Sequence, residues 1–165
     1  MRKVLLLACF LAASCGKGDE QANGNGGSAA APAPARGPVQ IATLTGLYES
    51  GGNPPSQICI IEQGRAARFG LVVRRNGRAG CSGAGNAVRS GTSLRLTMNG
   101  ESRCVIEARL EGRQLTFPAS LPSGCSYYCA PGAAVGTGAM RFEKIGGTGE
   151  DARRARDMVG DTLCA

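Results

Sequence analysis

The residues of this sequence with the most chemistry of their own are its eight cysteines, and histidine is absent. A thiolate acts as a nucleophile or metal ligand where a neighbouring base or cation lowers its pKa. Without imidazole, Cys-His and Ser-His-Asp nucleophiles and histidine-ligated zinc sites are excluded. No Cys-x-x-Cys spacing occurs, which argues against a thioredoxin-like redox site. We therefore expect structural cysteines, no metal site, no cofactor and no catalytic residues.

Two of the cysteines lie in an N-terminal segment with the parts of a secretory signal peptide. Residues 1–15 read MRKVLLLACFLAASC, with a cationic start, an apolar run too short to span a bilayer, and small residues before Cys15. The stretch LAASC resembles the lipobox of bacterial lipoproteins, in which the signal is cleaved before a cysteine that is then lipidated. This resemblance implies a signal peptide over 1–14, lipidation of Cys15 and, because Gly16 follows, an outer-membrane location.

Six cysteines remain after such processing, an even number that in an exported chain predicts three disulfides. They are Cys59, Cys81, Cys104, Cys125, Cys129 and Cys164. Their pairing stays open at this point. The strand pattern described below points Cys59 outward, where a C-terminal segment could bring Cys164 to it, and points Cys104 inward. Cys125 and Cys129 lie in an irregular, Gly- and Pro-flanked segment that they are expected to clip to the rest of the domain.

The charged residues include a cluster of arginines at one turn. Loss of the signal peptide lowers the formal charge of the chain from +7 to +5. Arg74, Arg75 and Arg78 bracket residues 76–77, and a two-residue turn there places Arg75 opposite Arg78, a destabilising pair unless an anion lies nearby. The cluster is either a contact site for an anionic envelope component or partner, or a solvated strand end. Nucleic acid is not an expected partner, because base-stacking aromatic residues are scarce.

Strands must position these residues. From Pro38 onward, short runs of alternating apolar residues are separated by Gly-containing turns, which is typical of an antiparallel meander. A first strand at 41–49 and a last one at 139–144 give seven or eight strands. Because closure removes exposed edges, such a meander forms a small barrel or a two-layer sandwich. The predicted fold class is mainly β, with one C-terminal α-helix.

The turn positions predict which residues pair across neighbouring strands. A two-residue loop at 63–64 places Ile58 opposite Phe69, so that both side chains face the core. A three-residue, bulged loop is expected at 99–101, and it places Leu96 opposite Cys104. Both registers keep the apolar side chains on one buried face.

A single helix is predicted near the C-terminus, over Gly149–Val159. Thr148 is its expected N-cap, Asp151 completes a capping box, and Gly160 ends it. A narrow stripe of alanine and valine follows helical spacing. This helix is expected to dock on the wall or across one mouth of the barrel.

The chain divides into three parts by composition. Residues 1–14 are expected to form the signal peptide, and 15–37 a Gly/Ala/Pro-rich tether that begins with the cysteine whose lipidation the lipobox resemblance implies. Residues 38–165 form the disulfide-stabilised β domain. Residues 16–37 contain no Val, Ile, Leu or Phe, so the segment cannot bury enough apolar area to offset its ordering entropy and should act as a flexible spacer.

Four stretches carry a resemblance to uncharacterised small lipoproteins of alphaproteobacteria: LAASC, LTGLYE, MRFEKIGG and EDARRARDMVGDTLC. This resemblance implies a lipid-anchored β domain that faces the periplasm, and it brings no enzymatic activity with it. We therefore expect a non-enzymatic interaction or ligand-binding domain attached to the membrane by its lipid.

A second resemblance suggests an alternative. Membrane-bound inhibitors of C-type lysozyme are lipid-anchored small barrels with a Ser-Gly-x-x-Tyr segment, and SGCSY at 123–127 is similar to it. This implies an inhibitor of lysozyme or another envelope hydrolase, with Ser123, Gly124, Tyr127 and Tyr128 in the contact loop. An apolar cavity inside the barrel would favour ligand binding, whereas a filled barrel with an exposed loop at Ser123–Cys129 would favour protein contact.

Overall fold

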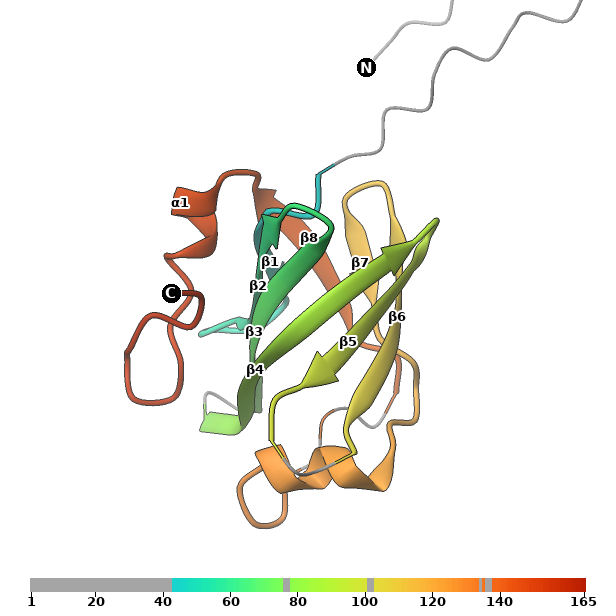
Figure 1. Ribbon diagram of the computed structural model, residues 1–165. Helices are drawn as coiled ribbons and strands as arrows, with labels where there is room; N and C mark the ends of the chain where they lie inside the picture. Colours follow the sequence, from blue (N-terminus) through green and yellow to red (C-terminus); the bar gives the residue numbers. More distant parts are fainter. Residues whose placement is uncertain (1–42, 76–77, 101–102, 134, 136–137) are drawn as a thin grey trace, which may run out of the picture. The chain divides into compact units, whose positions relative to one another are not determined.

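The computed structural model describes residues 43–165 except 76–77, 101–102, 134 and 136–137. The signal peptide, Cys15 and the tether lie outside the described residues. Eight antiparallel strands form a closed barrel in which each strand pairs with the next and the last pairs with the first (Figure 1). The predicted mainly β, antiparallel fold is confirmed, and of the two architectures allowed the chain adopts the barrel.

The elements follow one another in simple order around the barrel, with one short 3-10 helix and one short α-helix near the C-terminus. They are β1 (Gly46–Ser50), β2 (Ser56–Gln63), β3 (Ala66–Arg75), β4 (Arg78–Ser90), β5 (Ser93–Met98), β6 (Val105–Glu111), β7 (Gln114–Thr116), η1 (Ser123–Tyr128), β8 (Arg141–Gly146) and α1 (Gly149–Ala152).

Alternation along each strand fills the barrel interior. In β5, Leu94, Leu96 and Met98 are buried while Arg95 and Thr97 are exposed, as the period of two requires. Most interior side chains belong to one hydrophobic cluster. Its largest fully buried members are Tyr48, Phe69, Phe117, Phe142, Ile58, Ile60, Leu71, Leu94, Leu96, Ile106 and Leu115. Side chains occupy the interior of a barrel of this size, so it is a packed core.

Glycine takes the first position of the tight two-residue turns. Gly64, with φ +66°, begins the β2–β3 loop, and the glycines of the β4–β5 and β6–β7 loops do the same. The predicted register, with Gly64 second in its loop, is therefore wrong: Ile58 pairs with Leu71 and not with Phe69. Because the partner moves by two residues, every side chain keeps its predicted face.

The three-residue loop predicted between β5 and β6 is also wrong. Leu96 pairs with Ile106, and the amide of Met98 donates to the carbonyl of Cys104 at 3.1 Å, so a longer connection joins the two strands. Cys104 forms a disulfide with Cys125 of η1. This bridge holds the end of the connection against η1 and so replaces a tight hairpin.

The described part of the first strand begins later than predicted, at Gly46, and β8 both begins and ends two residues later than predicted, at Arg141 and Gly146. The amides of Leu44 and Thr45 donate to the carboxylate of Glu62 at 3.1 and 3.3 Å. These side-chain contacts satisfy the backbone just before β1, where strand pairing would otherwise be needed.

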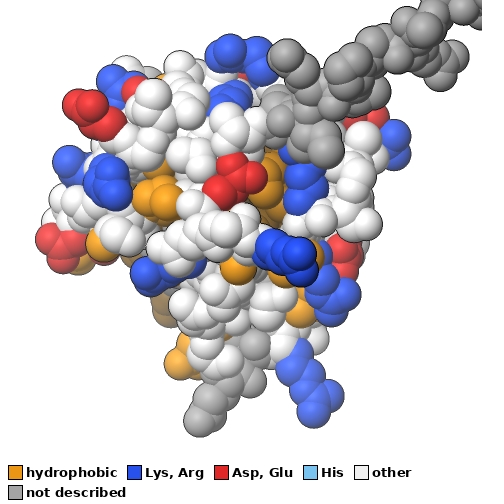
Figure 2. Space-filling model, turned by 45° about the horizontal axis from the view of Figure 1, so that its top comes forward, with side chains coloured by type: hydrophobic (Ala, Val, Ile, Leu, Met, Phe, Trp, Pro, Cys, Tyr) orange, Lys and Arg blue, Asp and Glu red, His pale blue; other side chains and the backbone are white. Residues whose placement is uncertain are grey.

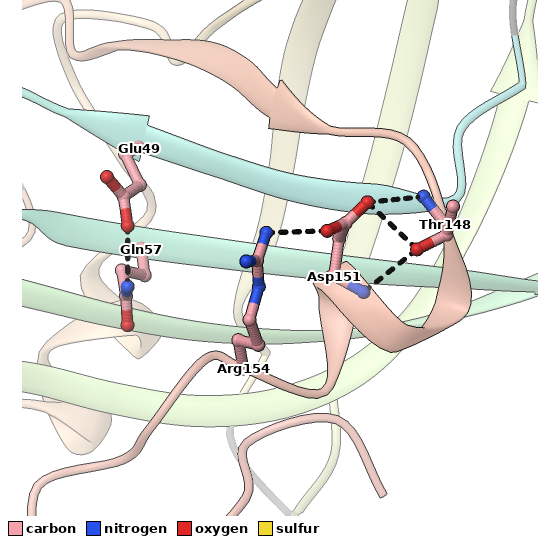
Figure 3. Close-up of polar contacts among 5 residues, drawn as sticks. All are labelled: Glu49, Gln57, Thr148, Asp151 and Arg154. Carbon is pink, nitrogen blue, oxygen red and sulfur yellow. Dashed lines mark hydrogen bonds and ion pairs between the residues drawn. The ribbon is translucent and has the colours of Figure 1, made fainter.

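The N-terminus of α1 is as predicted. The Thr148 hydroxyl accepts a hydrogen bond from the Asp151 amide at 3.0 Å, and the Asp151 carboxylate accepts one from the Thr148 amide at 3.0 Å (Figure 3). This reciprocal pair is a capping box. The carboxylate of Asp151 also forms an ion pair with Arg154.

The predicted extension of this helix to Val159 is wrong, because the chain doubles back after one turn. The Asp157 carboxylate accepts hydrogen bonds from the amides of Val159 and Asp161 at 2.8 and 2.9 Å. The Leu163 amide then donates to the Ala155 carbonyl at 3.0 Å. Ala155 is buried as expected, whereas Val159 is 82% exposed at the tip of the resulting loop.

The C-terminal segment forms a second layer on the outer face of β1 and β2. Leu47, Cys59, Ala152, Ala155 and Cys164 form a hydrophobic cluster of their own outside the barrel. A disulfide joins Cys59 to Cys164, in agreement with the predicted outward direction of Cys59. The segment is further joined to β2, since the Arg156 amide donates to Gln57, which donates in turn to Glu49 (Figure 3).

Candidate partner-binding end of the barrel

The η1 helix lies at the end of the barrel opposite to the end where the described chain begins (Figure 1). It interrupts the long connection between β7 and β8. Pro122 occupies its N-cap position, and the carbonyl of Pro122 accepts a hydrogen bond from the Cys125 amide at 2.9 Å. Proline lacks an amide hydrogen and glycine is flexible, so this Pro- and Gly-flanked sequence forms a compact connection and no further strand.

Two disulfides hold η1 to the barrel. Cys125 pairs with Cys104 and Cys129 pairs with Cys81, while the Ala130 amide donates to the Gly80 carbonyl at 2.8 Å. The expectation that Cys125 and Cys129 clip this segment to the domain is therefore confirmed. Both cystines immobilise the backbone on each side of Tyr127.

Close packing supports the same segment between its disulfides. A Cβ added to Gly124 would lie 2.9 to 3.1 Å from backbone atoms of Arg103, so glycine is required for this approach. The Tyr128 hydroxyl donates to the carbonyl of Asn99, and its ring lies over Gly83. Tyr128 is half-buried and joins η1 to β4 and to the connection that follows β5.

Tyr127 points the other way, into solvent. Its side chain is 76% exposed and meets the ring of Tyr128 edge-on, with ring centroids 5.3 Å apart. Ser123 and Ser126 are also exposed, and the Ser126 hydroxyl donates to the Ser123 carbonyl at 2.8 Å. A large aromatic side chain is thus presented on a rigid support, which lowers the entropy that a contact with a partner would cost.

The arginine cluster is divided by the structure. Arg75 and Arg78 are opposite each other, as predicted. Arg74 lies one position away and its guanidinium contacts the Asp157 carbonyl at 3.4 Å, so it contributes to the docking of the C-terminal segment. The side chain of Arg78 lies outside the described part of the chain.

The arginine turn and η1, predicted separately, lie at the same end of the barrel. Gly80, two residues after Arg78, bonds to Ala130, and Cys81 is bridged to Cys129. Arg103 lies on the other side and is packed against Gly124. The candidate site is therefore a rigid, exposed tyrosine between two arginine-bearing connections.

The barrel offers no comparable interior site in the residues described. Among the described residues the inward positions are filled by side chains, and one pocket on the outer face has a volume of only about 20 Å³. Ile61, Arg68 and Leu163 are among its lining residues. It lies beside the C-terminal segment and is too small for an organic ligand.

Sequence reasoning missed a polar cluster at the opposite end of the barrel. Lys144 is 8% exposed, donates to the Thr43 carbonyl at 2.6 Å and lies 5.4 Å from the centre of the Tyr48 ring. Burial lowers the pKa of Lys144 and raises the pKa of Tyr48 to about 12. The signal was present in the sequence, because Lys144 alternates with the inward Phe142 and so has to share its face.

Glu62 completes this cluster. Its carboxylate accepts hydrogen bonds from the hydroxyls of Thr43 and Thr45 as well as from the two backbone amides described above. Burial raises the pKa of Glu62, but the hydrogen bonds outweigh burial and hold that pKa below its usual range. These contacts hold the first described residues, so we assign the cluster a structural role.

Figure 2 shows the face toward this end, where Lys and Arg side chains form scattered groups and hydrophobic side chains form only small, separate patches. Nothing on that face resembles a large apolar docking surface. Among the described residues, an exposed aromatic side chain on a rigid support is therefore found at the η1 end and not on this face.

Within the described residues, no group of three or more Asp, Glu or Cys side chains is placed to hold a metal ion. No helix in this part of the chain is long and apolar enough to cross a membrane. Comparisons with models of protein families, with curated proteins and with solved structures found no match for this chain, so its function has to be inferred from its own geometry.

Proposed function

We propose that the protein is a non-enzymatic lipoprotein of the bacterial outer membrane, anchored through Cys15 and facing the periplasm, whose barrel binds a partner. The N-terminal sequence supports the anchor, as argued above. The three cystines support export, because disulfides persist in oxidising compartments such as the periplasm.

Binding is favoured over catalysis by the state of the ionisable groups. Glu62 and Lys144 have shifted pKa values, which can mark a catalytic site, but both are engaged with the backbone of Thr43 to Thr45. The carboxylates of Glu107, Glu111 and Glu143 lie on the barrel surface in ion pairs with arginines. This arrangement is typical of a folded scaffold.

The observation that carries the proposed binding role is the exposure of Tyr127 on a support held by two disulfides. Folding normally buries or leaves mobile a side chain of this size, whereas here the backbone on both sides is fixed to the barrel. Tyrosine is one of the residue types that dominate binding energy at protein interfaces. The filled interior favours contact with a partner over uptake of a small ligand.

The test is an affinity capture from envelope extract with the full-length chain as bait. Proteins recovered with wild type should fall at least roughly tenfold with Tyr127→Ala, as expected for an interface hot spot. Val88→Ala is the matched control, because Val88 is 56% exposed on the outer face of β4. Equal recovery by all three forms would remove η1 as the contact site.

The anchor requires a separate experiment. Cells that make the full-length chain are labelled with palmitate, and the label is compared with that of Cys15→Ala. We expect labelled wild type in the outer-membrane fraction and unlabelled variant in the soluble periplasm. An unlabelled wild type would refute lipidation.

An inhibitor of lysozyme or another envelope hydrolase is the second candidate. It is favoured by the position of the Ser-Gly-x-x-Tyr segment, since Ser123 and Tyr127 are exposed at the barrel end while Cys125 points into the domain. The purified protein is incubated with C-type lysozyme, and lysis of cell walls is followed. Full lytic activity at stoichiometric excess of the protein would remove this candidate.

A further inference from the structure

The connection that follows β5 begins with the dipeptide Asn99–Gly100. In such a dipeptide the backbone nitrogen of glycine can attack the side-chain amide of asparagine, because glycine has no side chain to hinder the approach. The fold requires glycine at position 100, where φ is +118° and an added Cβ would lie 3.0 Å from the Tyr128 hydroxyl oxygen. The same dipeptide occurs at 23–24, 25–26 and 76–77, outside the described residues.

Both reacting groups of this dipeptide are accessible. Asn99 and Gly100 are exposed, and among the described residues the Gly100 amide has no hydrogen-bond acceptor. The side-chain amide of Asn86 donates to Asn99 Oδ1 at 3.4 Å. A donor at this oxygen stabilises the negative charge that develops on it when the adjoining carbon is attacked. The fold therefore leaves the attacking nitrogen free and polarises the group that it attacks.

The two other asparagines within the described residues each lack one of these features. Asn53 precedes Pro54, whose nitrogen carries no hydrogen to lose. Asn86 precedes Ala87, which is buried and is paired with a neighbouring strand on each side. The amide of Ala87 is therefore held in the sheet. Of these three asparagines, only Asn99 combines exposure with a free neighbouring amide.

We propose that Asn99 is a site of spontaneous deamidation, with water as the co-reactant, and that the product loosens η1. The Gly100 nitrogen loses its proton and forms a bond to Asn99 Cγ, while the side-chain nitrogen leaves as ammonia. Water then opens the resulting succinimide ring at one of its two carbonyls and leaves aspartate or isoaspartate. The net reaction consumes water and releases ammonia, and it needs no oxidant or reductant.

Asn99 also supports η1, so its conversion should affect that segment. Its carbonyl accepts a hydrogen bond from the Tyr128 hydroxyl, and its amide donates to the Ala84 carbonyl at 2.8 Å, so the residue joins η1 to β4. In isoaspartate the main chain runs through the side-chain carbons and is longer, and the former main-chain carbonyl becomes a carboxylate. The Tyr128 hydroxyl then loses an acceptor whose position the connection had fixed.

The test ages the purified full-length protein in detergent at mildly alkaline pH and maps its peptides by mass spectrometry. We expect aspartate and isoaspartate to accumulate at position 99 while Asn53 and Asn86 stay intact. The rate should rise with pH, because the attacking amide reacts in its deprotonated form. Asn99→Gln is the matched variant: it keeps the carboxamide, but its longer side chain has to close a larger ring, so conversion at this position should be lost.

Limited proteolysis connects the modification to η1. Cleavage within Ser123–Tyr128 should be roughly fivefold faster in the aged wild type, as the loss of one hydrogen bond predicts for cleavage from an open state. Ageing should leave the cleavage rate of Asn99→Gln unchanged. If Asn99 stays intact in the folded protein while the reduced chain in urea is converted at the same pH, the site is refuted. Conversion at Asn99 with unchanged cleavage would overturn the effect on η1.

Discussion

Three polar residues in the barrel show how single side chains determine where the chain enters the fold. Tyr48 is 1% exposed, and its hydroxyl donates to the Leu44 carbonyl at 2.8 Å. Lys144 binds the carbonyl of Thr43, and Glu62 binds the amides that follow. A buried polar group costs free energy unless it is hydrogen-bonded. Each of these groups meets that condition by binding the same short segment.

Tyr48 should make the protein sensitive to alkaline pH. Burial raises the pKa of Tyr48 from 10.0 to about 12 in the folded state. The neutral phenol therefore favours the folded state fully below pH 10, and this contribution is lost as pH rises from 10 to about 12. The loss is on the order of 2–3 kcal/mol, from about 1.4 kcal/mol for each pKa unit.

Urea unfolding of wild type and Tyr48→Phe across this pH range provides the measurement. At neutral pH the variant should be about 1 kcal/mol less stable, because it lacks the hydrogen bond to Leu44. Above pH 10 the difference should shrink and reverse, since phenylalanine does not titrate and Lys144 is common to both proteins. Parallel curves for the two proteins would contradict the raised pKa.

For single residues, the sequence predicted the direction in which a side chain points better than the residues that it contacts. The period of two placed Cys59 outward and Cys104 inward, and both directions were correct. The exposure of Tyr127 could not be predicted, because it depends on Arg103, Asn99 and Cys81, which are distant in sequence. Lys144 was missed because a lysine is not expected on a core face, although its alternation with Phe142 placed it there.

At the scale of elements, the C-terminal segment shows how one side chain overrides a helical pattern. Ala152, Ala155 and Val159 follow helical spacing, yet only the two alanines are buried. The Asp157 carboxylate binds the amides of Val159 and Asp161, and aspartate competes for backbone amides in this way within helices. The helical spacing is therefore present in the sequence, but the two alanines cover the outer surface of β1 and β2 without a longer helix.

Gly70 should control the docking of this segment. A Cβ at this position would lie 2.5 Å from Leu163 Cγ and 2.6 Å from the Leu163 carbonyl oxygen. Gly70→Ala is therefore expected to lower the free energy of unfolding by about 1–3 kcal/mol, as overpacking does. Urea unfolding measures the loss, and limited proteolysis should show faster cleavage after Ala155.

Gly51→Ala is the control, because an added Cβ there has no atom within 4 Å. Its free energy of unfolding should stay within about 0.5 kcal/mol of wild type. Equal effects of the two substitutions would mean that Leu163 does not pack on β3 in solution.

Removal of one disulfide should loosen η1 and leave the barrel closed. The bridge from Cys104 to Cys125 spans 21 residues, a loop length for which chain entropy gives about 3 kcal/mol. In the double variant Cys104→Ser with Cys125→Ser, the free energy of unfolding should fall by about that amount. Far-ultraviolet circular dichroism should be retained, and proteolysis within Ser123–Tyr128 should become faster.

The matched variant replaces Cys59 and Cys164 by serine. It removes the bridge that joins β2 to the C-terminal segment on the outer face of the barrel. Cleavage within η1 should then proceed at the wild-type rate. Faster cleavage in both double variants would indicate that the bridges stabilise the domain as a whole and not the separate segments.

At the scale of the whole molecule, the barrel has two distinct ends. The segment that enters β1 is held at one end by Tyr48, Glu62 and Lys144, and η1 covers the other (Figure 1). The hairpin connections at the first end have two residues each, whereas three of the four connections at the second end are longer and only the β3–β4 turn has two residues. Variation in connection length thus separates a structural end from an end suited to recognition.

The fold class was predictable from the sequence for a physical reason. Alternating apolar residues between glycine turns leave one face to bury, and closure is the economical way to bury it. Pairing registers depend on single turn residues such as Gly64. The predicted β2–β3 loop lay one residue too early, so the partner of each residue differs by two positions from the predicted one. The joining of Arg75, Arg103 and Tyr127 at one end depended on disulfides, whose partners local sequence does not specify.

The disulfides also make correct folding depend on the order in which the cysteines become available for oxidation. The three bridges are fully nested: Cys104–Cys125 lies inside Cys81–Cys129, which lies inside Cys59–Cys164. As the chain is synthesised from its N-terminus, Cys59 and Cys81 emerge before either native partner. Oxidation in order of appearance would join them to each other, so correct pairing should require thiol–disulfide exchange.

We expect cells without a disulfide isomerase to accumulate a form with a bridge between Cys59 and Cys81, detected by mapping of non-reduced peptides. Cys81→Ser with Cys129→Ser should lessen this dependence, because the first competitor of Cys164 is gone. Native pairing at full yield without the isomerase would mean that the strands close before the thiols are oxidised. In that case the barrel fold, and not the order of oxidation, would determine how the cysteines pair.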